Sequence, residues 1–147
     1  MLETIEIALY GGLFLNAFIA ATLLPAFSEL SFATLIAAGE GTPALLFLSV
    51  TAGNVGGAVL NYWIGARLVE FQHRKWFPFT PDQIEKASAT FSRYGKWSLF
   101  FAWLPIVGDP LTLVAGILRT KFRFFILLVT IGKAARYAII WAGVSAL

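Results

Sequence analysis

Residues 103–137 read W-L-P-I-V-G-D-P-L-T-L-V-A-G-I-L-R-T-K-F-R-F-F-I-L-L-V-T-I-G-K-A-A-R-Y. The stretch is apolar on both sides of a short basic turn. It nevertheless holds Asp109 between a glycine and a proline, and Lys133 and Arg136 within a helix-length apolar run. At the centre of a bilayer each of these charges would cost about 2.5–3.5 kcal/mol or more. Charges retained at that cost indicate a functional site inside a membrane protein.

The composition of the whole chain supports a membrane protein. Of its 147 residues, 59% are hydrophobic and 13% are charged, and the mean hydropathy is +0.78. Ordinary globular chains are about 45–50% apolar and about 25% charged. We therefore expect an all-α integral membrane protein with one membrane domain, 1–147. Since there is no cysteine and the single His73 lies in a basic H-R-K context typical of the membrane interface, we expect no metal site and no cofactor.

The cations are distributed unevenly along the chain. All eleven Lys and Arg residues lie at or after Arg67, nine of them by Arg123, and the first 66 residues have none. This asymmetry fits the positive-inside rule and argues against a nucleic-acid partner. It predicts a multi-pass membrane protein with loops 67–96 and 119–123 in the cytoplasm. The start M-L-E-T-I-E is acidic, unlike a secretory signal, so we expect it to belong to the mature fold.

Hydropathy divides the chain into apolar segments and one polar section. Apolar runs of membrane-spanning length cover 7–24, 44–66 and 124–146, and 97–118 is broken in its middle by P-I-V-G-D-P. In the polar section, Thr80-Pro81-Asp82 should begin an amphipathic helix that continues to Tyr94. We place this helix along the inner membrane surface, with a soluble cap helix as the alternative.

Glycines mark one face of the 44–66 run. Gly53, Gly57 and Gly65 recur at multiples of four residues and so share a helix face. Small residues on one face let membrane helices approach closely. We therefore expect this helix to pack tightly against a neighbour.

Two parts of the chain resemble each other. L-P-A-F-S-E at 24–29 matches L-P-I-V-G-D at 104–109, and V-T-A-G-N at 50–54 matches V-T-I-G-K at 129–133, in the same order and at nearly the same spacing. The chain therefore divides into repeat one, 7–66, a linker with the amphipathic helix, 67–96, and repeat two, 97–146.

The charge pattern and the repeat together predict a topology. If both basic loops are cytoplasmic, 97–118 enters and leaves on one side as a re-entrant hairpin with its tip at 105–110. The repeat then makes 7–39 a matching hairpin, broken at 25–29, from the opposite side. Such an inverted repeat is common in secondary transporters. The rival topology makes 7–24 an ordinary span with a cytoplasmic N-terminus.

Opposed hairpin tips would bring two carboxylates near the middle of the membrane. Glu29 and Asp109 would meet there in a polar cavity, because non-helical backbone at that depth must be buried in protein or line a wet cavity. The residues expected to line the cavity from the long helices are Asn54, Asn61, Lys133, Arg136 and Tyr137.

The charged residues have two interpretations. Glu29–Arg136 and Asp109–Lys133 could be ion pairs that only fix helix packing. Alternatively, the cations hold an anionic headgroup while the desolvated carboxylates bind and release a proton. Arg93, at the end of the amphipathic helix, is either a secondary headgroup contact or an ordinary interfacial residue.

These motifs resemble the DedA family, also called the VTT or SNARE-associated Golgi-protein family, over 23–141. The resemblance rests on P-A-F-S-E, G-N-V-G-G-A-V-L-N-Y-W-I-G-A-R, F-S-R-Y-G-K-W, P-I-V-G-D-P-L-T-L-V-A-G and G-K-A-A-R-Y, and the last two motifs favour its short YqaA-like branch. It implies a bacterial inner-membrane protein with two opposed re-entrant hairpins. It also implies movement of lipid phosphates, such as undecaprenyl phosphate, or of phospholipids, driven by proton-motive force.

The chain departs from the family pattern at one position. Members usually carry an arginine three residues after the proline of the second hairpin, where this chain has Gly108. Lys133 and Arg136 could replace that arginine, but the substrate is left open.

The residues and the resemblance together predict a proton-linked translocase, or flippase, of a lipid phosphate. Glu29 and Asp109 would couple protons, and Arg136, Lys133 and Arg93 would bind the headgroup. Two alternatives stay open: a proton-coupled small-ion or solute transporter, and a non-transporting membrane assembly factor. An enzyme is least favoured because no Ser-His-Asp or other histidine-based set exists. Homo-oligomerisation is left open.

Overall fold

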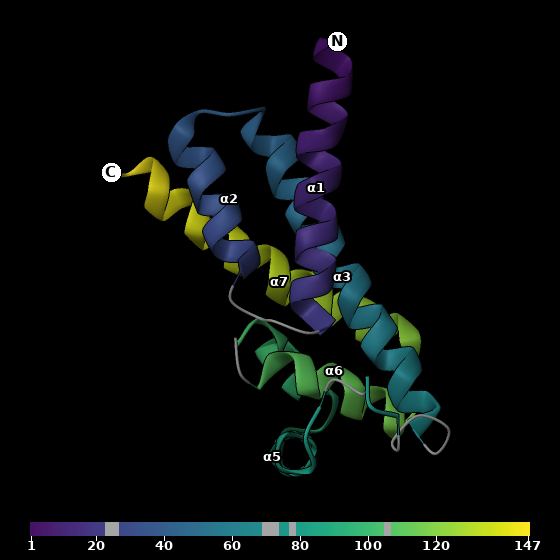
Figure 1. The fold of residues 1–147 in the computed structure, drawn as a ribbon. Helices are drawn as coiled ribbons and strands as arrows, with labels where there is room; N and C mark the ends of the chain where they lie inside the picture. The colour runs from purple at the N-terminus through teal and green to yellow at the C-terminus, as the bar shows by residue number, and fades with distance from the viewer. Residues whose placement is uncertain (23–26, 69–73, 77–78, 105–106) are drawn as a thin grey trace.

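The computed structural model describes residues 1–22, 27–68, 74–76, 79–104 and 107–147, and within them it contains helices and turns but no strand. The all-α prediction is therefore confirmed for this part of the chain (Figure 1). The elements are α1 (Leu2–Thr22), α2 (Phe27–Ala38), α3 (Pro43–Ala66), α5 (Pro81–Tyr94), the 3₁₀ helix η1 (Gly95–Trp103), α6 (Gly108–Ile117) and α7 (Phe122–Ser145).

Three of the described helices are long and apolar enough to cross a membrane. These segments are Glu3–Thr22, Pro43–Ala66 and Phe122–Ser145. A helix of 24 residues covers about 36 Å at about 1.5 Å per residue, which exceeds the hydrocarbon core of about 30 Å. Because α1 also has spanning length, helix length alone does not separate the hairpin topology from the rival one.

The helices are arranged as two contacting pairs, α1 with α2 and η1 with α6, around the two long helices α3 and α7. In Figure 1, α1 runs from the N-terminus into the middle of the molecule and α2 returns toward the same end. The pair formed by η1 and α6 lies in the other half, and α3 and α7 contact each other and both pairs. The expected hairpin breaks fall partly outside the described residues, because 23–26 and 105–106 are not described. His73 also lies outside them.

Glycines set how closely α3 approaches its neighbours. A Cβ on Gly53 would lie 2.2 Å from the Phe14 carbonyl oxygen of α1, and one on Gly65 would lie 2.0 Å from the Leu113 carbonyl oxygen of α6. The expected glycine-mediated packing is thus confirmed. One helix face nevertheless serves two neighbours, because α1 covers the first half of α3 and α6 covers the second.

The amphipathic helix begins where the sequence predicts. The Thr80 hydroxyl accepts a hydrogen bond from the Gln83 N–H, and the Gln83 side chain accepts one from the Thr80 N–H. This capping box satisfies donors that the first turn leaves free. Ala87, on the apolar face of α5, is fully buried and packs with Leu111 and Val114 of α6. The apolar face of α5 therefore contacts α6.

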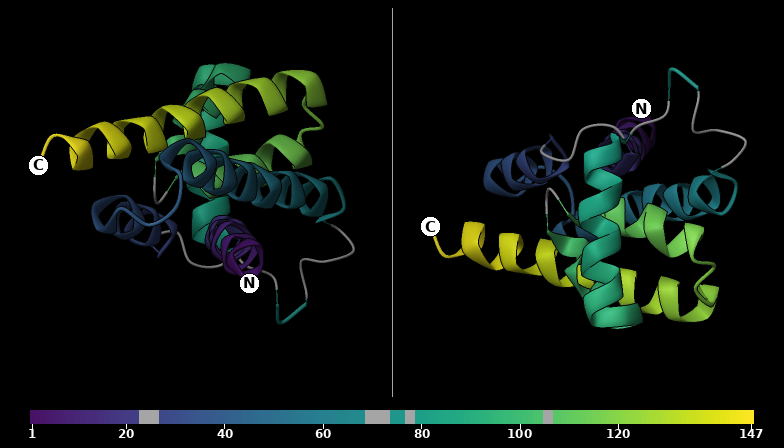
Figure 2. Two further views of the ribbon diagram at one scale, coloured as in Figure 1. Left: turned by 90° about the horizontal axis from the view of Figure 1, so that it is seen from above. Right: turned by 90° about the horizontal axis from the view of Figure 1, so that it is seen from below.

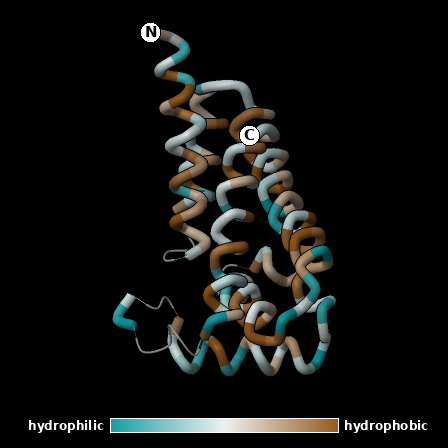
Figure 3. Tube along the Cα trace, turned by 90° about the vertical axis from the view of Figure 1, so that its right-hand side faces the viewer, coloured by the Kyte–Doolittle hydropathy of each residue, from teal (hydrophilic) through white to brown (hydrophobic). Residues whose placement is uncertain are grey.

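Two further views show where α5 and the polar residues lie. Seen from below, α5 crosses beneath the other helices (Figure 2, right). Hydrophilic segments gather at the N-terminal tip and at the opposite end, around α5 (Figure 3). The C-terminal end of α3 and the turn between α6 and α7 both lie at this α5 end (Figures 1 and 2).

Candidate functional site

Lys133 is the centre of a buried polar network. It lies near the midpoint of α7, and its side chain is fully buried. Its ammonium group donates a hydrogen bond to Asn54 Oδ1 of α3 and another, of 2.9 Å, to Asp109 Oδ1 of α6. Asp109 is 8% exposed. The cation is therefore paired with a carboxylate of α6 that lies 24 residues earlier in the chain.

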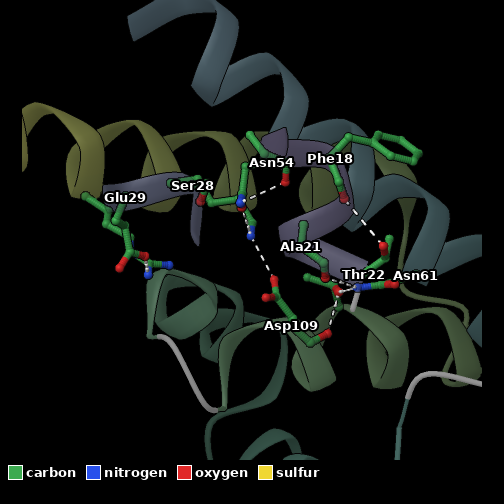
Figure 4. Close-up of polar contacts among 12 residues, drawn as sticks. Phe18, Ala21, Thr22, Ser28, Glu29, Asn54, Asn61 and Asp109 are labelled. Atoms are coloured by element: carbon green, nitrogen blue, oxygen red, sulfur yellow. Dashed lines mark hydrogen bonds and ion pairs between the residues drawn. The ribbon is translucent and has the colours of Figure 1, made fainter. Parts of the chain in front are cut away.

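The network continues from Asn54 into α1. Asn54 Nδ2 donates to the Ala17 carbonyl oxygen at 3.3 Å, while its Oδ1 accepts from Lys133. One chain of contacts thus joins α1, α3, α7 and α6, as the polar groups in Figure 4 show. A change in the charge of Asp109 or Lys133 would therefore alter a hydrogen-bond network that includes all four helices.

A second branch runs between α3 and α6. Asn61 Nδ2 donates to the Ala21 carbonyl oxygen at 3.0 Å and to Thr112 Oγ1 at 3.2 Å, and Thr112 Oγ1 donates to the Asp109 carbonyl oxygen at 2.5 Å. Ala21 is in the last turn of α1, where carbonyls lack helical partners. Asn61 therefore ties the end of α1 to the first turn of α6.

The second ion pair joins α2 to α7. Arg136 pairs with Glu29, and their side chains are 11% and 27% exposed. One residue away on each helix, the hydroxyls of Ser28 and Tyr137 are hydrogen-bonded at 2.9 Å. Glu29 lies in the first turn of α2, as Asp109 does in α6. Both carboxylates therefore stand at a helix N-terminus, which favours negative charge, and both face α7.

The structure brings together most of the residues expected at the site. Both expected ion pairs form, and Asn54, Asn61 and Tyr137 are buried in the same region. Arg93 is apart from them on α5, where its guanidinium lies 5.4 Å from the Tyr94 ring centroid. Because Lys133 and its partners contact one another directly, the polar cavity expected around them stays a prediction. Within the described residues, no group of histidine, cysteine and acidic side chains could hold a metal ion.

Two contributors were not recognised in the sequence. Ser28 fixes Tyr137, and Thr112 connects Asn61 to the backbone of Asp109. Ser28 directly precedes Glu29, and Thr112 follows Asp109 by three residues, one helical turn. The position of each hydroxyl beside a candidate acid was the available signal.

Sequence comparisons show a family and several relatives of the chain. The family model described as the VTT domain matches residues 8–146. The chain is 36% identical over 133 residues to "Inner membrane protein YqaA" of Escherichia coli (strain K12), covering 89% of this chain and 87% of that protein. It is 35% identical over 135 residues to an "Uncharacterized protein" of Haemophilus influenzae, covering 85% and 80%.

A weaker match covers part of a longer protein. The "Alkaline phosphatase-like protein" of Lactococcus lactis subsp. cremoris is 28% identical over 96 residues, which is 59% of this chain and 45% of that protein. No solved structure matches the chain.

Proposed function

Since this chain belongs to the VTT domain, or DedA, family, we propose that this membrane protein is a proton-linked translocase of a lipid phosphate. The observation that carries the proposal is the pair of acid–cation contacts at α7. Each carboxylate comes from the first turn of a short helix, and each cation comes from the long helix between them. An intramembrane ion pair is by default a candidate for an ion or substrate pathway.

The proposed path requires opposed re-entrant hairpins, formed by α1 with α2 and by η1 with α6. The antiparallel course of α1 and α2 supports this arrangement. So does the contact between Asn54 and Lys133, which occupy equivalent positions in the two repeats. Equivalent positions meet each other when they lie near a two-fold axis that relates two halves. In this topology each carboxylate sits near mid-membrane, at the inner end of a hairpin.

The two pairs would play different parts because they differ in exposure. Glu29 and Arg136 are partly exposed, so we assign them the first contact with a headgroup. Arginine binds phosphate with two parallel N–H donors. In this structure the Arg136 guanidinium is already paired with the Glu29 carboxylate. A proton on Glu29 would remove the competing charge and free Arg136 for phosphate. Proton uptake and headgroup binding would thereby be coupled.

Asp109 and Lys133 would act as the second, enclosed pair. Lys133 is fully buried and has two acceptors, so a headgroup can reach it only after the pair separates. A proton on Asp109 would weaken its hold on the ammonium group. Lys133 would then turn to the phosphate released by Arg136. Arg93 on α5 would be a secondary contact at the surface.

The proposal places the protein in the bacterial inner membrane, with loops 67–96 and 119–123 in the cytoplasm. The name of the Escherichia coli relative supports this placement, as does the position of α5, the end of α3 and the α6–α7 turn at one end of the molecule. Translocation uses no covalent chemistry and no cofactor. Undecaprenyl phosphate and phospholipids are the substrate classes to be tested.

Two other functions share parts of this evidence. The missing arginine at Gly108 favours a proton-coupled small-ion or solute transporter, since one phosphate ligand of the family pattern is absent. The full burial of Lys133 between Asn54 and Asp109 favours a non-transporting assembly factor, in which the ion pairs only fix helix packing.

The test is lipid flipping in reconstituted vesicles. We expect Glu29→Ala and Arg136→Ala to reduce the protein-dependent rate to the level of protein-free vesicles. Lys86→Ala, which removes an exposed cation paired with Asp82, should keep the wild-type rate. Monodisperse gel filtration of each variant controls for folding.

Three outcomes would decide against the proposal. Unchanged flipping in both Glu29→Ala and Arg136→Ala would refute the assigned roles. Ion flux that is independent of any lipid headgroup would favour the solute transporter. Retained cellular function after charge-neutral substitution at all four charged sites would favour the assembly factor.

A further inference from the structure

A pocket lies at the C-terminal end of α3 and shares no lining residue with the buried ion pairs. Its volume is about 470 Å³, and it is lined by Leu60, Trp63, Ile64, Arg67 and Trp76. Ile64 is 7% exposed, whereas Trp63 and Trp76 are 54% and 51% exposed. The pocket therefore has an apolar interior, two aromatic walls and one cation.

The pocket lies where a spanning helix leaves the membrane. Trp63, Ile64 and Arg67 fall at the last turn and end of α3, the candidate span Pro43–Ala66. Tryptophan is enriched at the headgroup level of membranes because its ring is apolar and its N–H is polar. An indole-walled pocket at this depth is suited to the upper part of a lipid molecule.

The charge around the pocket is mainly positive. Residues 67–76 contain three lysine or arginine residues and one acid, Glu70, which lies outside the described residues. Arg67 is exposed, and the described part of the chain contains no ion pair that includes it. Arg74 and Lys75, directly before Trp76, are exposed as well.

The second basic turn lies at the same end of α3. The Tyr62 hydroxyl donates to the Thr120 carbonyl oxygen at 2.6 Å, and the Trp63 and Phe122 ring centroids are 6.5 Å apart. The 119–123 turn, with its three cations, is thus held beside the pocket. Clusters of basic residues next to a spanning helix attract anionic lipids.

We propose that this pocket binds an anionic phospholipid of the surrounding membrane. The headgroup phosphate would contact the Arg67 guanidinium, and the first part of an acyl chain would lie along Leu60, Trp63 and Ile64. Charge complementarity selects the anionic headgroup, and the apolar interior selects a lipid over a free phosphate. The site goes beyond the proposed transport, because it uses none of the residues assigned to translocation.

The test is native mass spectrometry of the full chain in a neutral detergent, titrated with phosphatidylglycerol or phosphatidylcholine. We expect tighter binding of phosphatidylglycerol, weakened about fivefold or more by Arg67→Ala and Arg67→Gln. Trp63→Ala should weaken both lipids. The exposed Lys86→Ala on α5 removes an equal charge and should change neither. Gel filtration and thermal unfolding of each variant show whether it is folded.

Equal binding of the two lipids by the wild type would overturn the proposal, as would wild-type phosphatidylglycerol binding in both Arg67 variants. Release of the lipid by glycerol phosphate without acyl chains, at the same concentration, would show a phosphate site and would also overturn it. Because binding is measured without transport, the lipid site and the translocase proposal can fail separately.

Discussion

At the scale of single residues, the buried charge of Lys133 depends on two partners. Its fully buried ammonium group relies on Asp109 for charge and on Asn54 for a second acceptor. Removal of one partner from a buried pair leaves a charge without compensation, which typically costs about 3–5 kcal/mol. Removal of the charges of both Asp109 and Lys133 leaves no buried charge to desolvate. The pair therefore makes a clear double-mutant experiment.

We predict that Asp109→Asn and Lys133→Met each lower the free energy of unfolding by about 3–5 kcal/mol, and that the double variant loses clearly less than the sum. Thermal unfolding in detergent, followed by circular dichroism, measures the change. Asp82→Asn and Lys86→Met are the matched control, because that pair is 70% and 71% exposed and should change stability by less than about 1 kcal/mol. Additive losses at Asp109 and Lys133 would show that the two side chains are not coupled.

The sequence identified the residues that carry this site because charge in an apolar run is visible without a fold. The glutamate, aspartate, lysine and arginine were all found in this way. Ser28 and Thr112 were not found, because a hydroxyl in an apolar helix has many roles. Their partners are also distant in sequence: Asn61 lies 51 residues from Thr112, and Tyr137 lies 109 residues from Ser28. Only the packed helices show which hydroxyl completes which contact.

At the scale of elements, close backbone approach at glycine holds α3 against α6. Gly65 meets the Leu113 carbonyl oxygen, and Gly116 meets the Tyr62 carbonyl oxygen, so the contact is reciprocal. A methyl group on either glycine would stand about 2 Å from that oxygen, closer than the van der Waals contact distance of about 3.5 Å. The two helices would have to separate.

We predict that Gly65→Ala lowers the free energy of unfolding by about 2 kcal/mol or more through overpacking. Gly143→Ala, in α7, is the control, because a Cβ there meets nothing within 4 Å. It should be neutral or stabilising by up to about 1 kcal/mol, since alanine is the better helix former. Chemical or thermal unfolding of the two variants side by side gives the comparison. Equal stability of both variants would contradict the close α3–α6 contact.

Helices with local signals could be predicted, and those fixed by tertiary contacts could not. The start of α5 follows from Thr80, Pro81 and Gln83, which act within one turn. The 3₁₀ helix η1 begins at Gly95, where φ is +62°, and packs against α6 and α7, but no residue within it signals 3₁₀ geometry. α1 also begins at Leu2, ahead of the apolar run that predicted it, with Glu3 in its first turn, where a helix N-terminus favours negative charge.

At the scale of the whole molecule, the side of the membrane that holds the N-terminus separates the two topologies. The N-terminal tip and α5 lie at opposite ends of the molecule (Figure 1). With two opposed hairpins, the N-terminus lies on the side opposite the basic loops. With 7–24 as an ordinary span, the N-terminus is cytoplasmic.

The absence of cysteine from the chain makes this difference measurable. We predict that Thr4→Cys reacts with a membrane-impermeant maleimide in spheroplasts, and that Ser92→Cys, on the exposed surface of α5, reacts only after the membrane is opened. Labelling of both positions only in opened membranes would support the ordinary span. Labelling of Ser92→Cys in sealed spheroplasts would contradict the assignment of the basic loops to the cytoplasm.

The most direct test of the central claim is the rate of lipid-phosphate translocation by the wild-type chain in vesicles with an imposed pH gradient. Undecaprenyl phosphate and phosphatidylglycerol are supplied in one leaflet, and their appearance in the other is followed. We predict that the wild-type chain translocates an anionic lipid phosphate faster than protein-free vesicles do, and that the rate changes when the gradient is reversed or collapsed. Rates equal to those of protein-free vesicles under every gradient would contradict it.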